Sequence, residues 1–223
     1  MQQWNRFDDA DQLAQEAAWF IADRIEEILA SRPLCHIALP GGSTPAQCLR
    51  YLAEKSLEWA RIHWYLTDER CYPPGHPERN DQMLDENLWS LINADSSTIH
   101  RIPAELGPEQ AALQYAEEIA AINALDIVVL GMGEDGHTAS LFPRNPALNE
   151  HALVVPVDDA PKPPSQRVSL GMNALHDASF RIVLAAGEGK AEALDRVRKK
   201  IALPISQVGH LIWFVDTSAL SEL

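Results

Sequence analysis

The residues best suited to catalytic chemistry lie in a glycine-rich loop at positions 131–143. His137 follows Asp135 by two positions, among glycines at 131, 133 and 136. A histidine titrates near neutral pH and is the usual general base of enzymes, and a neighbouring carboxylate orients its ring and stabilises its protonated form. We therefore predict that His137 is a catalytic base, with Asp135 or Asp68 as the carboxylate beside it.

The same loop has two alternative interpretations. It contains the spacing GxGxxG, which is typical of dinucleotide-binding turns, but Pro143 and Pro146 would end the long helix that such a site needs. No HxxxH or HExxH spacing accompanies His137. We therefore expect no cofactor and no metal at this site.

A second loop follows an apolar run that ends at Leu39 and reads Gly41-Gly42-Ser43-Thr44 before Pro45. Two glycines allow a tight turn, and Thr44 is predicted to cap a helix whose first residue is Pro45. Backbone N–H groups at a helix N-terminus bind anions. The loop therefore predicts an anion site at Gly41, Gly42, Ser43 and Thr44, although a simple capped turn explains the pattern equally well.

A charged cluster, Asp68-Glu69-Arg70, ends another apolar run. Asp68 is a candidate acid or base, and the planar fork of Arg70 suits a phosphate group. For Glu69 we expect a local ion pair with Arg70.

Two further cations stand near predicted strand ends. Arg167 begins a short β-rich run, and Lys190 follows Gly187-Glu188-Gly189 at the start of a predicted helix. A cation at a helix N-terminus opposes the helix dipole, so the placement of Lys190 hints at a bound anion. Together with Arg70, these residues predict a phosphate-binding cluster.

The net charge sharpens that prediction. The chain carries 32 acidic and 18 basic residues, a formal charge of −14, which argues against nucleic acid as a partner. A phosphorylated substrate would be repelled by the molecule as a whole, so its binding requires a local group of cations and N–H donors.

The positions of these loops follow from the predicted elements. Short β-rich runs alternate with helical patterns, which indicates an α/β fold with a doubly wound, mostly parallel sheet flanked by helices in three Rossmann-like layers. In such sheets, ligands bind beyond the carboxyl ends of the strands. The predicted strands are 35–39, 62–66, a short one near Ile99, 125–130, 152–157, 167–170, 180–185 and 211–215, and the predicted helices are 9–30, one opening near Thr44, 80–92, 108–122 and 188–200. The proline-rich segment 158–165 is interpreted as a stiff surface loop, with a lid beside a site as the alternative.

Other features bound the class of protein. No apolar run approaches the roughly 20 residues that span a bilayer, and the N-terminus lacks the layout of a secretory signal. The three cysteines form no CxxC pair, so Cys35 and Cys48 are expected to be small buried hydrophobes. We expect a cytoplasmic protein that does not bind membranes.

Taken together, these motifs resemble the 6-phosphogluconolactonase family. The resemblance runs in order through residues 39–45, 67–70, 130–143, 167–170 and 187–190, and the segment 133–143, GEDGHTASLFP, is its most specific part. It implies one α/β domain over residues 1–223 that hydrolyses 6-phosphoglucono-δ-lactone to 6-phosphogluconate in the oxidative pentose phosphate pathway, without cofactor or metal. The implied partner is a small sugar-phosphate lactone, and we expect a monomer or weak homodimer.

Two rival functions share part of the pattern. Glucosamine-6-phosphate deaminases belong to the same larger group, but their motif carries a glutamate where this chain has Phe142, and phenylalanine cannot transfer a proton. Related folds also act as sugar-phosphate sensors, which would keep the cations but need no base. His137 favours the enzyme.

Overall fold

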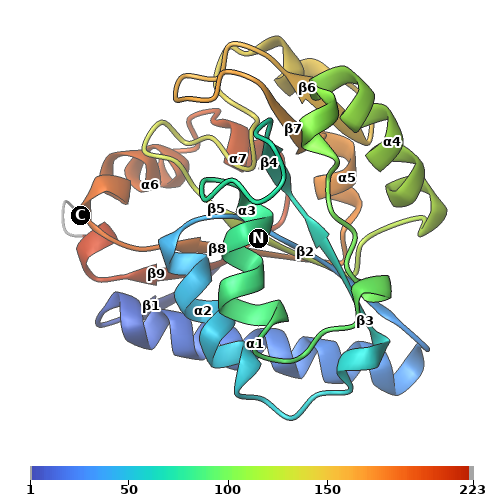
Figure 1. The fold of residues 1–223 in the computed structure, drawn as a ribbon. Helices are drawn as coiled ribbons and strands as arrows, with labels where there is room; N and C mark the ends of the chain where they lie inside the picture. Colours follow the sequence, from blue (N-terminus) through green and yellow to red (C-terminus); the bar gives the residue numbers. More distant parts are fainter. Residues whose placement is uncertain (1, 221–223) are drawn as a thin grey trace.

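A six-stranded parallel sheet forms the centre of the computed structural model, which describes residues 2–220 (Figure 1). All neighbouring strands of this sheet run in the same direction, which confirms the expected doubly wound α/β fold. The strands lie in the order β1 (Gln3–Phe7), β9 (Ile212–Asp216), β8 (Phe180–Ala185), β5 (Ile127–Gly131), β2 (Cys35–Leu39) and β3 (Ile62–Leu66).

The central strand is β5, whose residues Ile127 to Leu130 are all buried. Its apolar run has no polar alternation because both faces of the strand are covered. β5 lies between β8 and β2, so the loops that follow these three strands emerge side by side at one edge of the sheet.

Helices α1 (Ala10–Ser31) and α2 (Ser43–Ala53) cover one face of the sheet (Figure 1). In α1 the buried residues recur at helical spacing, including Leu13, Ala17, Ile21 and Ile25. The helix begins after Asp9, whose carboxylate accepts a hydrogen bond from the N–H of Gln12 at 2.9 Å.

A second, antiparallel sheet lies on the opposite side of the main sheet (Figure 1). It contains β4 (Asp68–Arg70), β7 (Arg167–Leu170) and β6 (Val154–Val157). Helices α4 (Pro108–Ala121) and α5 (Met172–Asp177) accompany it, and buried apolar side chains from both sheets belong to one hydrophobic cluster.

Several elements differ from the sequence-based expectation. The predicted helix 80–92 is α3 (Asn80–Leu84) followed by a π-turn, Asp85–Trp89, and the predicted helix 188–200 is a 3₁₀ turn, Glu188–Lys190, followed by α6 (Ala191–Arg198). Ile99 makes only an isolated bridge to Trp64. Strands β1 and β4, and the short helices α5 and α7 (Pro204–Gln207), carry no clear apolar period and were not expected.

Other expectations concern single residues and the membrane. Cys35 and Cys48 are buried in the core, as predicted. Within residues 2–220, no helix has both the length and the apolar character needed to cross a bilayer.

A buried carboxylate, that of Glu69, connects β4 to the start of α3. It accepts hydrogen bonds from the backbone N–H groups of Arg70 at 2.8 Å, Asn80 at 2.7 Å and Asp81 at 2.8 Å, and it lies 3.8 Å from the guanidinium of Arg79. The expected ion pair with the Arg70 side chain is therefore wrong, because Glu69 points away from it into the interior. Burial, with Asp81 nearby, raises the pKa of Glu69 to about 7 against the opposing effect of the three N–H donors.

Replacing Glu69 by Gln should destabilise the protein by about 1–3 kcal/mol, because the amide NH₂ would face backbone N–H groups and leave one of them unpaired. Urea unfolding at pH 5, below the raised pKa of Glu69, measures this loss while the wild-type carboxyl is neutral in the folded protein, so that the two proteins do not differ in buried charge. The matched control is Glu58→Gln, since Glu58 is exposed and paired with Arg61, and should change stability by less than about 0.5 kcal/mol. Equal midpoints for the two variants would contradict the role given to Glu69.

Candidate active site

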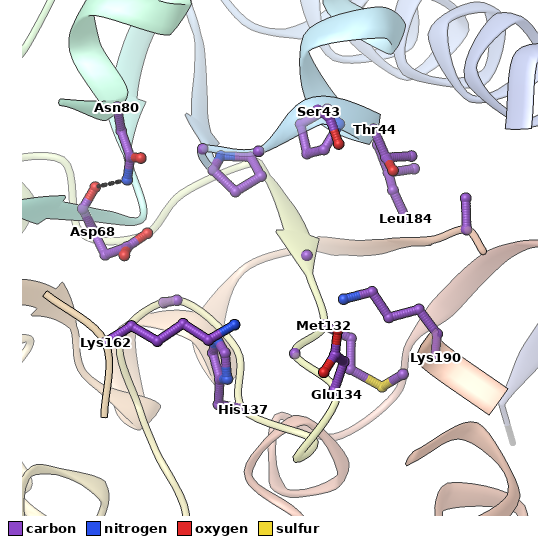
Figure 2. Close-up of a pocket in the computed structure, with 18 of the residues that line it drawn as sticks. Ser43, Thr44, Asp68, Asn80, Met132, Glu134, His137, Lys162, Leu184 and Lys190 are labelled. Atoms are coloured by element: carbon purple, nitrogen blue, oxygen red, sulfur yellow. Dashed lines mark hydrogen bonds between the residues drawn. The ribbon is translucent and has the colours of Figure 1, made fainter. Parts of the chain in front are cut away.

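A cavity of about 310 Å³ opens at the carboxyl ends of the parallel strands. The loops after β2, β5 and β8 line it from the main sheet, and β4 and β7 line it from the second sheet (Figure 2). This is the edge where a parallel sheet is expected to bind its ligands. Nine of the ten sequence-predicted site residues line the cavity, namely Gly41, Gly42, Ser43, Thr44, Asp68, Arg70, His137, Arg167 and Lys190.

The tenth predicted residue, Asp135, lies behind His137. Its carboxylate oxygen Oδ1 is 2.6 Å from His137 Nδ1 and also accepts a hydrogen bond from the His137 backbone N–H at 3.0 Å. Partial burial acts to raise the pKa of Asp135, but the bonds from His137 outweigh it and lower the pKa to about 2. Asp135 is therefore an anion at neutral pH. It fixes the imidazole so that, within residues 2–220, Nε2 keeps no hydrogen-bonding partner.

Two neighbours hold the imidazole ring in place. The buried ring of Phe142 lies against it, with the two centroids 4.6 Å apart. Gly133 permits the ring to lie close to the backbone, because a Cβ atom there would stand 2.0 Å from His137 Nδ1. Any side chain at position 133 would displace the histidine.

Asp68 lies in the cavity wall, and its hydrogen bonds within the described residues go to groups other than His137. Its carboxylate accepts a hydrogen bond from the Ser140 hydroxyl at 2.7 Å and another from the Thr67 hydroxyl at 3.1 Å. Its backbone carbonyl accepts a hydrogen bond from the Asn80 amide at 2.8 Å (Figure 2). Of the two carboxylates considered from the sequence, the structure thus places Asp135 against His137. Asp68 instead bonds to Ser140, three residues after the histidine.

The start of α2 forms the opposite wall. Gly42 adopts φ +114°, a conformation that side chains disfavour, and it is the N-cap residue of a helix that begins at Ser43. The predicted cap at Thr44 is therefore wrong, since Thr44 already lies inside the first turn. The first intrahelical bond runs from the Ala46 N–H to the Gly42 carbonyl, so the N–H groups of Ser43 and Thr44 lie ahead of the helix's own bonds.

Two arginines stand opposite each other on neighbouring strands of the second sheet. Arg70 and Arg167 are direct cross-strand partners in the β4–β7 pair, and both line the cavity. Like charges directly opposite one another destabilise a sheet unless an anion neutralises them. Burial lowers the pKa of Arg167, and Arg70 adds to the effect, although Asp68 opposes it. The Arg70 Nε atom is buried and has no hydrogen-bonding partner among residues 2–220.

Lys190 enters the cavity from the turn after β8 (Figure 2). Burial lowers its pKa, Glu134 acts to raise it, and Lys162 lowers it further. The cavity thus holds several cations that would be more stable with an anion between them.

Three lining residues with polar side chains were missed from the sequence: Asn80, Glu134 and Lys162. The sequence pattern gives little indication of Asn80 and Glu134, because their positions in the site depend on contacts across the fold. Lys162 could have been found, because it lies in the proline-rich segment that precedes Arg167. That segment lies beside the cavity, as the alternative interpretation of a lid requires. Within residues 2–220, no group of three or more His, Cys, Asp or Glu side chains is arranged to hold a metal ion.

Comparison with known proteins agrees with this geometry. Residues 8–213 match the family model described as "Glucosamine-6-phosphate isomerases/6-phosphogluconolactonase". A 6-phosphogluconolactonase from Streptomyces coelicolor is 32% identical, over 96% of this chain and 92% of its own length. The crystal structure of a 6-phosphogluconolactonase from Thermotoga maritima superimposes with a TM-score of 0.91 at 29% identity, covering 97% of this chain and 100% of that one.

The fold is shared beyond the lactonases. A monomeric glucosamine-6-phosphate deaminase superimposes with a TM-score of 0.87 at 20% identity, over 98% of this chain and 99% of that one. At that identity the likeness shows the fold alone. The family match and the 32% identical relative show that this chain belongs to the glucosamine-6-phosphate isomerase/6-phosphogluconolactonase family.

Proposed function

We propose that the protein is a lactone hydrolase that converts 6-phosphoglucono-δ-lactone to 6-phosphogluconate in the oxidative pentose phosphate pathway. The observation that carries the proposal is the His137–Asp135 pair, in which Nε2 keeps no partner among residues 2–220, at the edge of a cavity rich in cations. The names of the relatives support the same substrate.

The phosphate group is proposed to bind at the start of α2. The N–H groups of Gly42, Ser43 and Thr44, which donate to no acceptor among residues 2–220, would donate to its oxygens, as at other helix N-termini. Arg70, Arg167 and Lys190 would supply the positive charge, and the opposed arginines would lose their mutual repulsion.

With the phosphate anchored, the lactone carbonyl is proposed to face His137. Nε2 accepts a proton from a water molecule as the water oxygen bonds to the carbonyl carbon, and the carbonyl electron pair moves onto its oxygen. The pair then returns, the bond to the ring oxygen breaks, and His137 gives its proton to that oxygen. Asp135 stabilises the imidazolium between the two steps.

Phe142 bears on the rival chemistry. The deaminase pattern described above has a glutamate at this position, whereas Phe142 is apolar and packs on the His137 ring. It fixes the base but cannot carry a second proton. We therefore propose lactone hydrolysis rather than deamination, with no metal and no cofactor.

We also propose that this activity is cytoplasmic and that the protein acts as a monomer or weak homodimer, as one domain without nucleic acid or membrane partners. The proposed domain spans 1–223, of which positions 1 and 221–223 lie outside the described residues. The acidic composition supports the exclusion of nucleic acid.

Replacing His137 by Ala should lower turnover of the enzymatically generated lactone by about two orders of magnitude or more, because the general base is lost. Acid release above the spontaneous rate measures turnover, with ammonia release from glucosamine 6-phosphate followed in parallel. Calorimetric binding of 6-phosphogluconate should stay within about threefold. His151→Ala, at an exposed loop histidine, is the matched control. Near-wild-type turnover in the His137 variant, or ammonia release by the wild type, would overturn the proposal.

Replacing Lys190 by Met should weaken binding of 6-phosphogluconate by about 10–100-fold, since a charge-assisted hydrogen bond contributes about 1.5–3 kcal/mol. Calorimetry measures the affinity, and KM should rise more than kcat falls. Lys200→Met removes an equal charge from the exposed end that follows α6. If both lysine variants bound the product alike, the phosphate site would lie elsewhere.

Replacing Asp135 by Asn should lower kcat/KM about tenfold or more and move the acid limb of its pH profile to lower pH. The wild-type carboxylate is ionised throughout the accessible range because its pKa is about 2, so it always favours the protonated imidazole. A pH–rate series measures the shift. Asp177→Asn, at an exposed aspartate 3.6 Å from His176, serves as the control. An unmoved acid limb would refute the pairing.

A further inference from the structure

The proline-rich segment 158–165 lies beside the cavity, where a buried side chain of the protein interior holds it. The Arg167 guanidinium donates from Nη2 to the carbonyl of Lys162 at 3.0 Å and to that of Pro163 at 3.3 Å, and from Nε to that of Pro164 at 3.3 Å. A buried side chain thus fixes three consecutive carbonyls of an exposed turn. The position of Lys162 is set by the interior although the residue itself is exposed.

A chain of contacts places this turn on the His137 side of the cavity. Arg167 lies over the ring of Phe142, with Cζ 5.8 Å from its centroid, and Phe142 packs against the His137 ring. In Figure 2 the Lys162 side chain extends into the cavity toward His137, and Lys190 extends from the opposite side.

The Lys162 ammonium has no hydrogen bond or ion pair with any of the described residues 2–220. It nevertheless lines the cavity and lies near enough to Lys190 to disfavour the charge there. Glu134 acts on Lys190, but within residues 2–220 neither lysine has a hydrogen bond or ion pair. Two lysines that converge in this way indicate that a ligand with separated negative charges belongs between them. The phosphate supplies one such charge, for which Lys190 and the start of α2 are available.

Resting on the function proposed above, we propose that Lys162 is a further substrate-contacting residue. Its ammonium donates to the carbonyl oxygen of the lactone, where negative charge develops as water adds, and to the carboxylate of the product. Lys162 gives up no proton and ends the reaction unchanged. It thereby fills the role of oxyanion stabiliser, which the residues around His137 otherwise leave open.

Two ligands separate this role from phosphate binding: 6-phosphogluconate, which carries a phosphate and a carboxylate, and glucitol 6-phosphate, which lacks the carboxylate. Lys162→Met should weaken 6-phosphogluconate binding about tenfold and leave glucitol 6-phosphate within about twofold. Lys190→Met should weaken both. Calorimetry on the full chain measures all four affinities, and Lys199→Met, at an exposed lysine paired with Asp195, is the control.

In the lactonase assay, Lys162→Met should lower kcat by about 10–100-fold, and Lys162→Arg should restore part of the loss. The thermal unfolding midpoint of this variant should equal that of the wild type, because the Lys162 side chain makes no hydrogen bond or ion pair within residues 2–220. If Lys162→Met weakened the binding of both ligands equally, Lys162 would be a phosphate ligand and the assignment would be wrong. Unchanged kcat and unchanged affinity for 6-phosphogluconate would also overturn the assignment. The wild type could lack lactonase activity while Lys162→Met still weakened the binding of 6-phosphogluconate alone and Lys190→Met the binding of both ligands. The proposed function would then be wrong, but carboxylate recognition by Lys162 would be supported.

Discussion

The common direction of the six strands is the constraint on which the site depends. Because β2, β5 and β8 are parallel neighbours, the turn at Gly42, the His137 loop and the turn before Lys190 leave the sheet at the same edge. Helix α2 begins there too, so its N–H groups and its dipole face the same space. The second sheet then closes the cavity by bringing β4 and β7 across this edge. Residues separated by more than a hundred positions thus meet without any long excursion of the chain.

That arrangement also resolves the problem set by the net charge of −14. The overall field repels a phosphate ester, but Arg70 and Arg167 stand opposite each other at a register fixed by the β4–β7 pairing. Glu69 keeps this register intact, because it ties β4 to the start of α3 through three backbone N–H groups. A buried acid on one face of β4 therefore supports the charged groups on the other.

The sequence was informative where function follows local pattern. Parallel strands such as 35–39 and 180–185 could be predicted to the residue from apolar runs, and the site loops followed because ligands bind beyond strand ends. Glu69 was misjudged because its partners, Asn80 and Asp81, are eleven and twelve positions away and donate from the backbone, which no side-chain pattern reveals. The short strands β1 and β4 escaped for a related reason, since both take their conformation from pairing rather than from their own apolar period.

The loop that carries Lys162 shows why electrostatic preorganisation requires rigid support. An exposed lysine ordinarily loses rotamer freedom when it binds a ligand, and a mobile loop would add its own ordering cost. Here Arg167 holds the turn through three carbonyls while its charge is partly desolvated, so the cost of placing positive charge is met during folding. Like charges held close together oppose stability in the empty cavity and favour the state in which an anion separates them. With the role proposed for Lys162, the same repulsion that weakens the free protein increases the selectivity of the cavity for a ligand with negative charge at both ends.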